Sequence, residues 1–292
     1  MYELIKVTEN CYYVDCPAKI GIVKTAPGEV VLIDSGNNKD AGKKVLRHLN
    51  ENGWRATAIL NTHSHADHIG GNAFLQKETG CKIYARGIEC DFTNHPILEP
   101  AFLYGGYPYS DLRHKFLLAE ESRAEYLTED LLPSGMTLLP LPGHSFDMVG
   151  FRTADGVVYL ADALSSKETL DKYAVSFIYD VGAYLETLRT LKTMDAALFV
   201  PSHAAPTEDI APLARYNIEK VFEIAERILR ICEFPMSFEA ILMKLCEYYS
   251  ITMTHEQYVL VGSTLRSYLS WLKGDGRLIA AFIGNLPCYQ TR

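Results

Sequence analysis

Hydrophobic residues in the first two hundred positions occur either in short unbroken runs or at helical spacing. The short runs at 30–33, 58–60, 82–85, 157–161 and 197–200 predict buried strands. Helical spacing at 39–52, 71–79 and 184–193 predicts helices, and we expect Asn72 to cap the second of them. The alternation of strands and helices predicts an α/β fold.

Residues 88–134 interrupt this alternation. The stretch contains the turn-forming pairs His95-Pro96 and Gly105-Gly106 and reads as irregular. Long irregular segments inside compact domains are often lids or binding loops. We therefore expect either a lid over a binding site or a contact between two copies of the chain in a homodimer. The density of aromatic residues makes the hydroxyls of Tyr104, Tyr107 and Tyr109 candidate donors to a substrate.

Helical character dominates after about residue 210. Hydrophobic spacing predicts a long helix that ends before Pro235, a second helix capped by Ser237 and a third capped by Thr254. Residues 278–289 predict a short hairpin around Asn285. Three helices followed by a hairpin resemble a winged-helix arrangement. The sequence therefore predicts two domains, residues 1–210 and a smaller, mainly helical domain of residues 211–292.

Composition and charge argue against several classes of protein. Hydrophobic residues make up 48% of the 292 residues and charged residues 22%, which is typical of a globular protein. The net charge of −8 argues against nucleic acid as the main partner. No apolar run reaches the ~20 residues of a membrane helix, and residues 1–14 lack a signal-peptide core, so we expect a cytoplasmic protein. The seven cysteines include no Cys-x-x-Cys pair, which favours reduced, buried thiols.

The segment 62–71 carries the strongest chemical signal in the chain. It reads Thr-His-Ser-His-Ala-Asp-His-Ile-Gly-Gly and directly follows a predicted buried strand. Three histidines and an aspartate so close together add little to the stability of the fold unless they bind a ligand. Zinc accepts both imidazole and carboxylate ligands. His63 and His65 would lie on the same side of an extended segment. Asp67 and His68 follow on a turn and can bind a second metal ion.

Three further residues of ligand type stand at the ends of predicted strands. They are His144, Asp162 and His203. Loops at one edge of a sheet commonly carry the functional residues of α/β proteins. We expect these three side chains to join the histidine-rich segment.

With these residues in view, positions 1 to about 210 resemble the metallo-β-lactamase superfamily, for which the His-x-His-x-Asp-His run is highly specific. The resemblance implies an αββα sandwich with a dinuclear metal site at the edge of its two sheets. It assigns the first metal to His63, His65 and His144, the second to Asp67, His68 and His203, and a bridging position to Asp162. It also implies that Asp34 supports a ligand without binding metal itself. The complete ligand set is most similar to the glyoxalase II and lactonase branch.

This resemblance implies a hydrolase that acts on a small-molecule ester, thioester, lactone or amide. Two divalent ions lower the pKa of a shared water from ~15.7 towards ~7, and Asp67 would orient the resulting hydroxide. Zinc is the expected metal, and iron or manganese would accept the same ligands. Two alternatives stay open. One is a nuclease or phosphodiesterase of the same superfamily, and the other is a mononuclear iron protein similar to persulfide dioxygenases.

Overall fold

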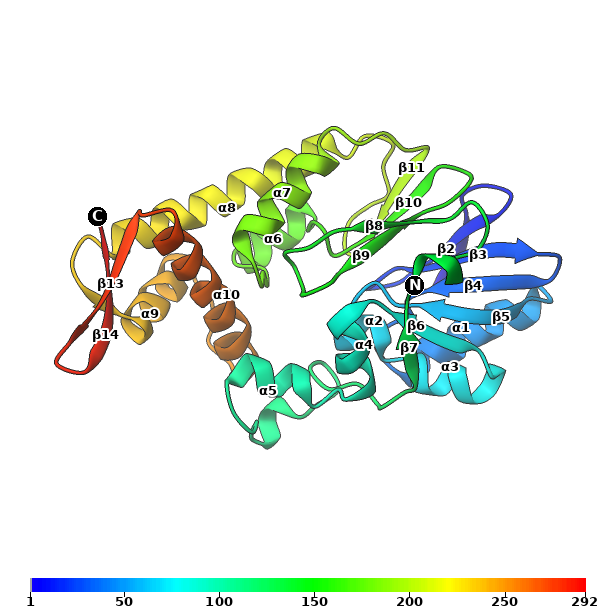
Figure 1. Ribbon diagram of the computed structural model, residues 1–292, viewed down its shortest axis with the longest axis horizontal. Coiled ribbons are helices and arrows are strands. Elements are labelled where there is room, and N and C mark those ends of the chain that lie inside the picture. The colour runs from blue at the N-terminus through cyan, green and yellow to red at the C-terminus, as the bar shows by residue number, and fades with distance from the viewer. Residues whose placement is uncertain (1) are drawn as a thin grey trace. The chain divides into compact units, whose positions relative to one another are not determined.

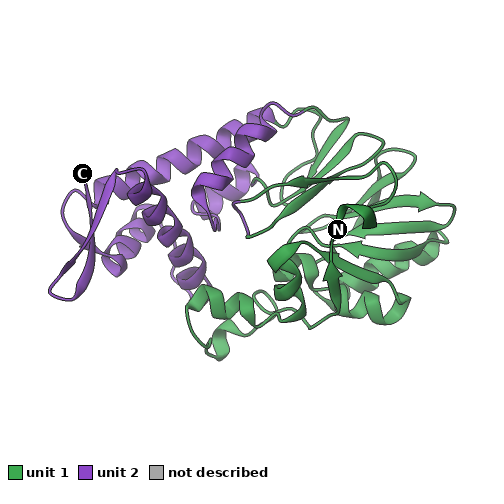
Figure 2. Cartoon of the chain, viewed as in Figure 1, with its two compact units in different colours: residues 1–142, 146–164, 195–210 green, residues 143–145, 165–194, 211–292 purple. Residues whose placement is uncertain are grey.

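The computed structural model describes residues 2–292, which form two compact units (Figure 2). The first unit comprises the chain up to Pro142 together with Phe146–Leu164 and Asp195–Ile210. The second comprises Gly143–Ser145, Ser165–Met194 and Ala211–Arg292. Residues 165–194 thus group with the C-terminal part of the chain. Whether a cut at residue 210 separates two independently folding domains stays a prediction.

A seven-stranded sheet forms the N-terminal half of the first unit (Figure 1). Its strands pair in sequence order, antiparallel from β1 to β4 and parallel from β4 to β7. They are β1 (Glu3–Lys6), β2 (Cys11–Asp15), β3 (Ile20–Ala26), β4 (Glu29–Ile33), β5 (Arg55–Leu60), β6 (Lys82–Ala85) and β7 (Ala124–Tyr126). The apolar runs predicted at 30–33, 58–60 and 82–85 are confirmed as strands, and they belong to the parallel part, where near-continuous hydrophobic runs are expected.

A second sheet of four strands has the order β11-β10-β9-β8. Its members are β8 (Thr137–Pro140), β9 (Val149–Arg152), β10 (Val157–Ala161) and β11 (Leu198–Pro201). Side chains from both sheets form one buried cluster, in which Val31 and Leu60 from the first sheet pack with Phe151 and Tyr159 from the second. The Tyr159 hydroxyl donates to the carbonyl of Tyr12 at 2.7 Å. The sheets therefore pack face to face around a common core.

Helices α1 (Lys39–Glu51) and α3 (Asn72–Thr79) contribute Val45, Leu49 and Leu75 to a second buried cluster with the first sheet. Helix α1 ends at Glu51, and Asn52 occupies its C-cap position. The prediction that Asn72 caps α3 is wrong, because Gly71 occupies the cap position. The Asn72 side chain is instead buried and donates to Asn61 Oδ1 at 2.8 Å.

The stretch 88–134 is more regular than its turn signals predicted. It contains most of α4 (Gly87–Asn94), all of α5 (Leu98–Tyr104), two short 3₁₀ turns and β7. The expectation of an irregular loop is therefore wrong. Cys90, Phe92 and Leu103 are buried, so apolar packing favours helix formation here. Pro100 lies in the first turn of α5, where proline is tolerated. A role as a lid or as a dimer contact stays a prediction.

The second unit is mainly helical. It contains α6 (Lys167–Tyr173), α7 (Val181–Leu191), α8 (Ala211–Ile231), α9 (Phe238–Tyr248) and α10 (His255–Gly274), with β12 (Met236–Ser237), β13 (Leu278–Ile283) and β14 (Leu286–Thr291) forming a three-stranded sheet. Ser237 and Thr254 cap α9 and α10, as predicted. The predicted hairpin is confirmed as β13–β14, and Asn285 lies in its turn with φ 65°. Within residues 2–292, no helix is both long and apolar enough to span a membrane.

Candidate metal centre

The histidine-rich loop begins where β5 ends, and its backbone is held by a neighbouring strand end. Strands β4 and β5 are parallel, so their carboxyl ends share one edge of the sheet. Asp34 follows β4 and accepts hydrogen bonds from Thr62 N at 2.8 Å and from Thr62 Oγ1 at 2.7 Å. The helical turn α2 (Ala66–Ile69) then carries Asp67 and His68. This turn lies against the segment after β4, because Ser35 N donates to the carbonyl of His68 at 2.8 Å.

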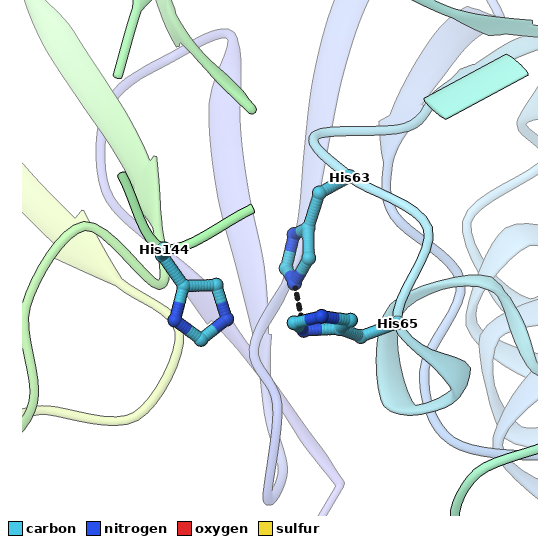
Figure 3. A group of neighbouring side chains, drawn as sticks. All are labelled: His63, His65 and His144. Atoms are coloured by element: carbon cyan, nitrogen blue, oxygen red, sulfur yellow. Dashed lines mark hydrogen bonds between the residues drawn. The ribbon is translucent and has the colours of Figure 1, made fainter. Parts of the chain in front are cut away.

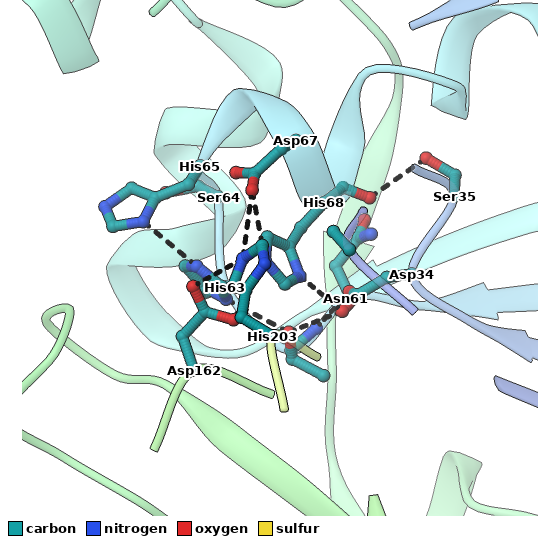
Figure 4. Close-up of polar contacts among 12 residues, drawn as sticks. Asp34, Ser35, Asn61, His63, Ser64, His65, Asp67, His68, Asp162 and His203 are labelled. Carbon is teal, nitrogen blue, oxygen red and sulfur yellow. Dashed lines mark hydrogen bonds and ion pairs between the residues drawn. The ribbon is translucent and has the colours of Figure 1, made fainter. Parts of the chain in front are cut away.

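Strand ends of the second sheet bring two more predicted ligands to this loop. Asp162 directly follows β10, and His203 lies two residues after β11. Figure 4 shows both side chains directed at those of Asp67 and His68. The structure therefore assembles four of the predicted residues from three separate stretches of the first unit.

Asp162 contacts imidazoles on both sides. Its Oδ1 lies 3.1 Å from His68 Nε2, and its Oδ2 lies 3.2 Å from His203 Nε2. Asp67 Oδ2 lies 3.2 Å from His203 Nε2 and 3.8 Å from His68 Nε2. Two carboxylates and two imidazoles thus face one small volume. In each of the sets His63–His68–Asp162 and Asp67–His68–His203, one ligand atom per residue lies within 4.8 Å of the others.

The charges in this cluster shift the pKa of each group in a consistent direction. Burial alone would lower the pKa of both imidazoles, but the carboxylates of Asp162 and Asp67 raise the pKa of His203 to about 10 and that of His68 well above its usual range. Burial would raise the pKa of both carboxyls, but the facing imidazoles hold them well below the usual range. The cluster therefore attracts positive charge, supplied either by protons on the imidazoles or by a bound cation.

The side chains present fit a divalent cation. His68 Nε2 is buried, and no hydrogen bond among residues 2–292 uses it. Imidazole nitrogen and carboxylate oxygen form the donor set that zinc, iron and manganese accept. Such a cation would replace the protons on the imidazoles, which must be neutral to act as ligands.

His63 and His65 lie next to this cluster and face each other. His63 Nε2 lies 3.0 Å from His65 Nδ1, as the dashed line in Figure 3 shows. The same figure draws His144, the third residue predicted for this cation position. His144 belongs to the second unit, where its Nδ1 lies 3.1 Å from the carbonyl of Phe177.

One ring nitrogen of each histidine in the candidate centre contacts a neighbouring oxygen. Such contacts fix the ring orientation and leave the other nitrogen for a metal ion. The pairs are His63 Nδ1 with Thr62 Oγ1 (3.0 Å), His65 Nε2 with Glu99 Oε1 (3.5 Å), His68 Nδ1 with Asp34 Oδ2 (2.8 Å), His144 Nδ1 with Phe177 O (3.1 Å) and His203 Nδ1 with Pro17 O (2.8 Å). The expected contact of Asp34 with a candidate ligand is thus present.

Two buried carboxyl groups near the loop were not singled out from the sequence. Glu89 in α4 accepts hydrogen bonds from Ser64 N at 2.9 Å and Ser64 Oγ at 2.6 Å, and Glu99 in α5 faces His65. Burial, followed by the charge of Glu89, raises the pKa of Glu99 to about 8. Acidic residues in a stretch that reads as a surface loop give no signal of burial, so a single sequence offered no way to identify them.

The predicted tyrosines lie at and after the end of α5. The rings of Tyr104 and Tyr109 contact each other with centroids 5.2 Å apart. Tyr107 is 76% exposed, and its hydroxyl accepts a hydrogen bond from Arg113 at 3.0 Å. A role for these hydroxyls toward a substrate stays a prediction.

Two curated proteins are similar to part of this chain. A hydroxyacylglutathione hydrolase of Cereibacter sphaeroides is 33% identical over 140 residues, which cover 48% of this chain and 44% of the relative. A metal-dependent hydrolase of Thermodesulfovibrio yellowstonii is 36% identical over 86 residues, covering 30% of this chain and 29% of the relative. The chain thus matches less than half of the length of these curated relatives.

Two solved structures share the fold over nearly the whole chain. A beta-lactamase domain protein from Burkholderia ambifaria has a TM-score of 0.76 at 17% identity, covering 99% of this chain and 94% of its own. A metallo-beta-lactamase family protein from Thermus thermophilus has a TM-score of 0.74 at 19% identity. The match covers 98% of this chain and 100% of the other. These likenesses confirm the predicted fold class, an α/β metallo-β-lactamase fold followed by a C-terminal helical region.

The family model of the metallo-beta-lactamase superfamily matches residues 10–203, about two thirds of the chain. The matched range includes every predicted metal ligand, from His63 to His203. The chain belongs to the metallo-beta-lactamase superfamily.

Proposed function

We propose that this protein is a dinuclear metal-dependent hydrolase of a small-molecule ester, thioester, lactone or amide. The observation that carries the proposal is the position of Asp162, one oxygen of which lies within 4.8 Å of ligand nitrogens of both His63 and His68, residues that we assign to different cations. A carboxylate in this position can bridge two cations. The relatives named hydroxyacylglutathione hydrolase and metal-dependent hydrolase support the same class of reaction.

The proposed ligand assignment follows the sets of facing side chains. His63, His65 and His144 would hold one cation, and Asp67, His68 and His203 the other. Zinc is the proposed metal because imidazole predominates among the ligands. Two such ions, when bound, supply a hydroxide near neutral pH and polarise the carbonyl oxygen of the substrate.

The chain's own residues orient the attacking water. Asp67 Oδ2 lies within 3.8 Å of both His68 Nε2 and His203 Nε2, so its carboxylate can hold the water's proton and aim its lone pair at the substrate. Asp34 fixes the His68 ring through the contact at 2.8 Å, which keeps Nε2 directed into the cluster. No serine or cysteine nucleophile is required by this mechanism.

The proposal is tested by metal analysis together with a substrate panel. The panel contains an acylglutathione thioester, a lactone, a β-lactam, bis-nitrophenyl phosphate and a glutathione persulfide. We expect two metal ions per chain and turnover of the thioester or lactone. Turnover of the phosphodiester alone would identify a phosphodiesterase, and one iron per chain with oxygen consumption on the persulfide would identify a dioxygenase. Either result would overturn the proposal.

Substitutions of the proposed metal ligands test whether the activity depends on this cluster of side chains. Asp162→Ala should lower the turnover number by more than about 100-fold and reduce the bound metal. Even a residue that only supports a ligand typically changes metal affinity or activity by about 10- to 100-fold when it is replaced. His63→Ala should do the same. His255→Ala is the matched control, because this histidine is exposed at the start of α10 and lies outside every metal-ligand set described above. Unchanged metal content in both site variants would contradict the ligand assignment.

A further inference from the structure

Two carboxyl groups of helices α4 and α5 lie buried against the histidine-rich loop. Glu89 is fully buried, and Glu99 is 7% exposed. Burying a carboxyl group is costly unless a partner compensates it. The partners of both groups should therefore show what this helical insertion does for the loop.

Glu89 binds the loop backbone. One of its oxygens accepts from Ser64 N and Ser64 Oγ, and the other accepts from Asp147 N at 3.0 Å. Ser64 is the residue between His63 and His65. Glu89 thus anchors the backbone of this segment, and its hydrogen bonds do not involve the two imidazole rings.

Glu99 contacts one of those rings directly. Its Oε1 lies 3.5 Å from His65 Nε2, while His65 Nδ1 lies 3.0 Å from His63 Nε2 on the other side of the ring. When Nδ1 holds a cation, the ring proton lies on Nε2, which faces the Glu99 carboxyl. The two nitrogens of His65 therefore have different roles, and the position of Glu99 selects between them.

We propose that Glu99 is a positioning residue for the cation at His63, His65 and His144. It holds the His65 ring so that Nδ1 faces the cation. Because Glu99 lies on α5, the insertion contributes to the affinity of this metal position and not of the other. This inference rests on the proposed metal centre, and it concerns only one of its two positions.

Zinc titration of metal-free protein against a competing chelator tests the affinity part. Glu99→Leu should weaken one of two binding events by about 10- to 100-fold and leave the other unchanged. Glu99→Gln should restore much of that affinity, because an amide oxygen still accepts the N–H of His65. The matched control is Glu129→Gln, an exposed carboxyl group in the same insertion. Equal weakening of both events, or of neither, would overturn the proposal.

The unfolding midpoint of the metal-free protein gives a second readout that needs neither metal nor activity. Glu99→Leu should keep the wild-type midpoint, because leucine suits a position that is only 7% exposed. A purely structural role would lower the midpoint and would not weaken one zinc-binding event selectively. If wild type hydrolyses nothing in the panel, the proposed function fails, while the zinc titration still decides the role of Glu99.

Discussion

Asp34 shows at the scale of one residue how the centre is organised. Its backbone has φ 63°, a conformation that aspartate adopts more readily than most residues. From this position one carboxyl group contacts the loop backbone, the Thr62 hydroxyl and the ring of His68. A single side chain therefore fixes both the path of the loop and the orientation of a candidate ligand.

Replacing Asp34 with alanine should affect both stability and cation binding. The amide of Thr62 would stay buried without its acceptor, which costs about 1–3 kcal/mol of the free energy of unfolding. The affinity of the cation position at His68 should fall about 10- to 100-fold. Chemical denaturation of the metal-free protein and zinc titration measure the two effects. Asp130→Ala, at an exposed position, is the control. Unchanged zinc affinity in Asp34→Ala would show that the contact with His68 does not matter.

At the scale of elements, the turn α2 is placed by backbone-to-backbone packing. Gly71 follows this turn, and a Cβ added there would lie 2.4 Å from the carbonyl oxygen of Ser35. Its φ is −89°, so glycine is required here for space and not for conformation. The close approach lets Gly71 N donate to the carbonyl of Gly36 at 3.2 Å, which holds the segment carrying Asp67 and His68 against the end of β4.

Gly71→Ala should therefore displace α2 and destabilise the protein. The added methyl group meets backbone that cannot move aside, so we expect a loss of about 1–3 kcal/mol in the free energy of unfolding and weaker zinc binding. Gly274→Ala is the matched control, because a Cβ at this last residue of α10 meets nothing within 4 Å. The prediction fails if the two variants have the same unfolding midpoint.

At the scale of the whole chain, the cysteines behave as the composition predicted. All seven are free and buried. Burial raises the pKa of the Cys232 thiol, in the second unit, to about 12. The folded protein therefore keeps this thiol protonated at a pH where the unfolded chain, with a pKa of ~8.5, ionises it.

The stability contributed by this group has a defined pH window. It is fully present below about pH 8.5 and is lost as the pH rises toward the folded value, because the folded state then binds more protons than the unfolded state. Between pH 8 and 10, the unfolding midpoint of wild type should fall more steeply than that of Cys232→Ala. Thermal unfolding at closely spaced pH values measures both slopes. Parallel slopes would contradict the assigned burial effect.

The sequence alone determined the fold class and the set of candidate ligands. Unbroken apolar runs identify strands because parallel strands are buried on both faces, and ligand-type residues at their ends indicate a shared site. Only the tertiary structure decided the rest. The stretch 88–134 folds largely as helices, and Phe92 of α4 packs against Phe146, a contact that no local pattern reveals. The partners of the histidine rings, Glu99 and the Pro17 carbonyl among them, come from distant segments. Local periodicity reports which residues are buried, whereas contacts between distant segments arise only when the chain packs.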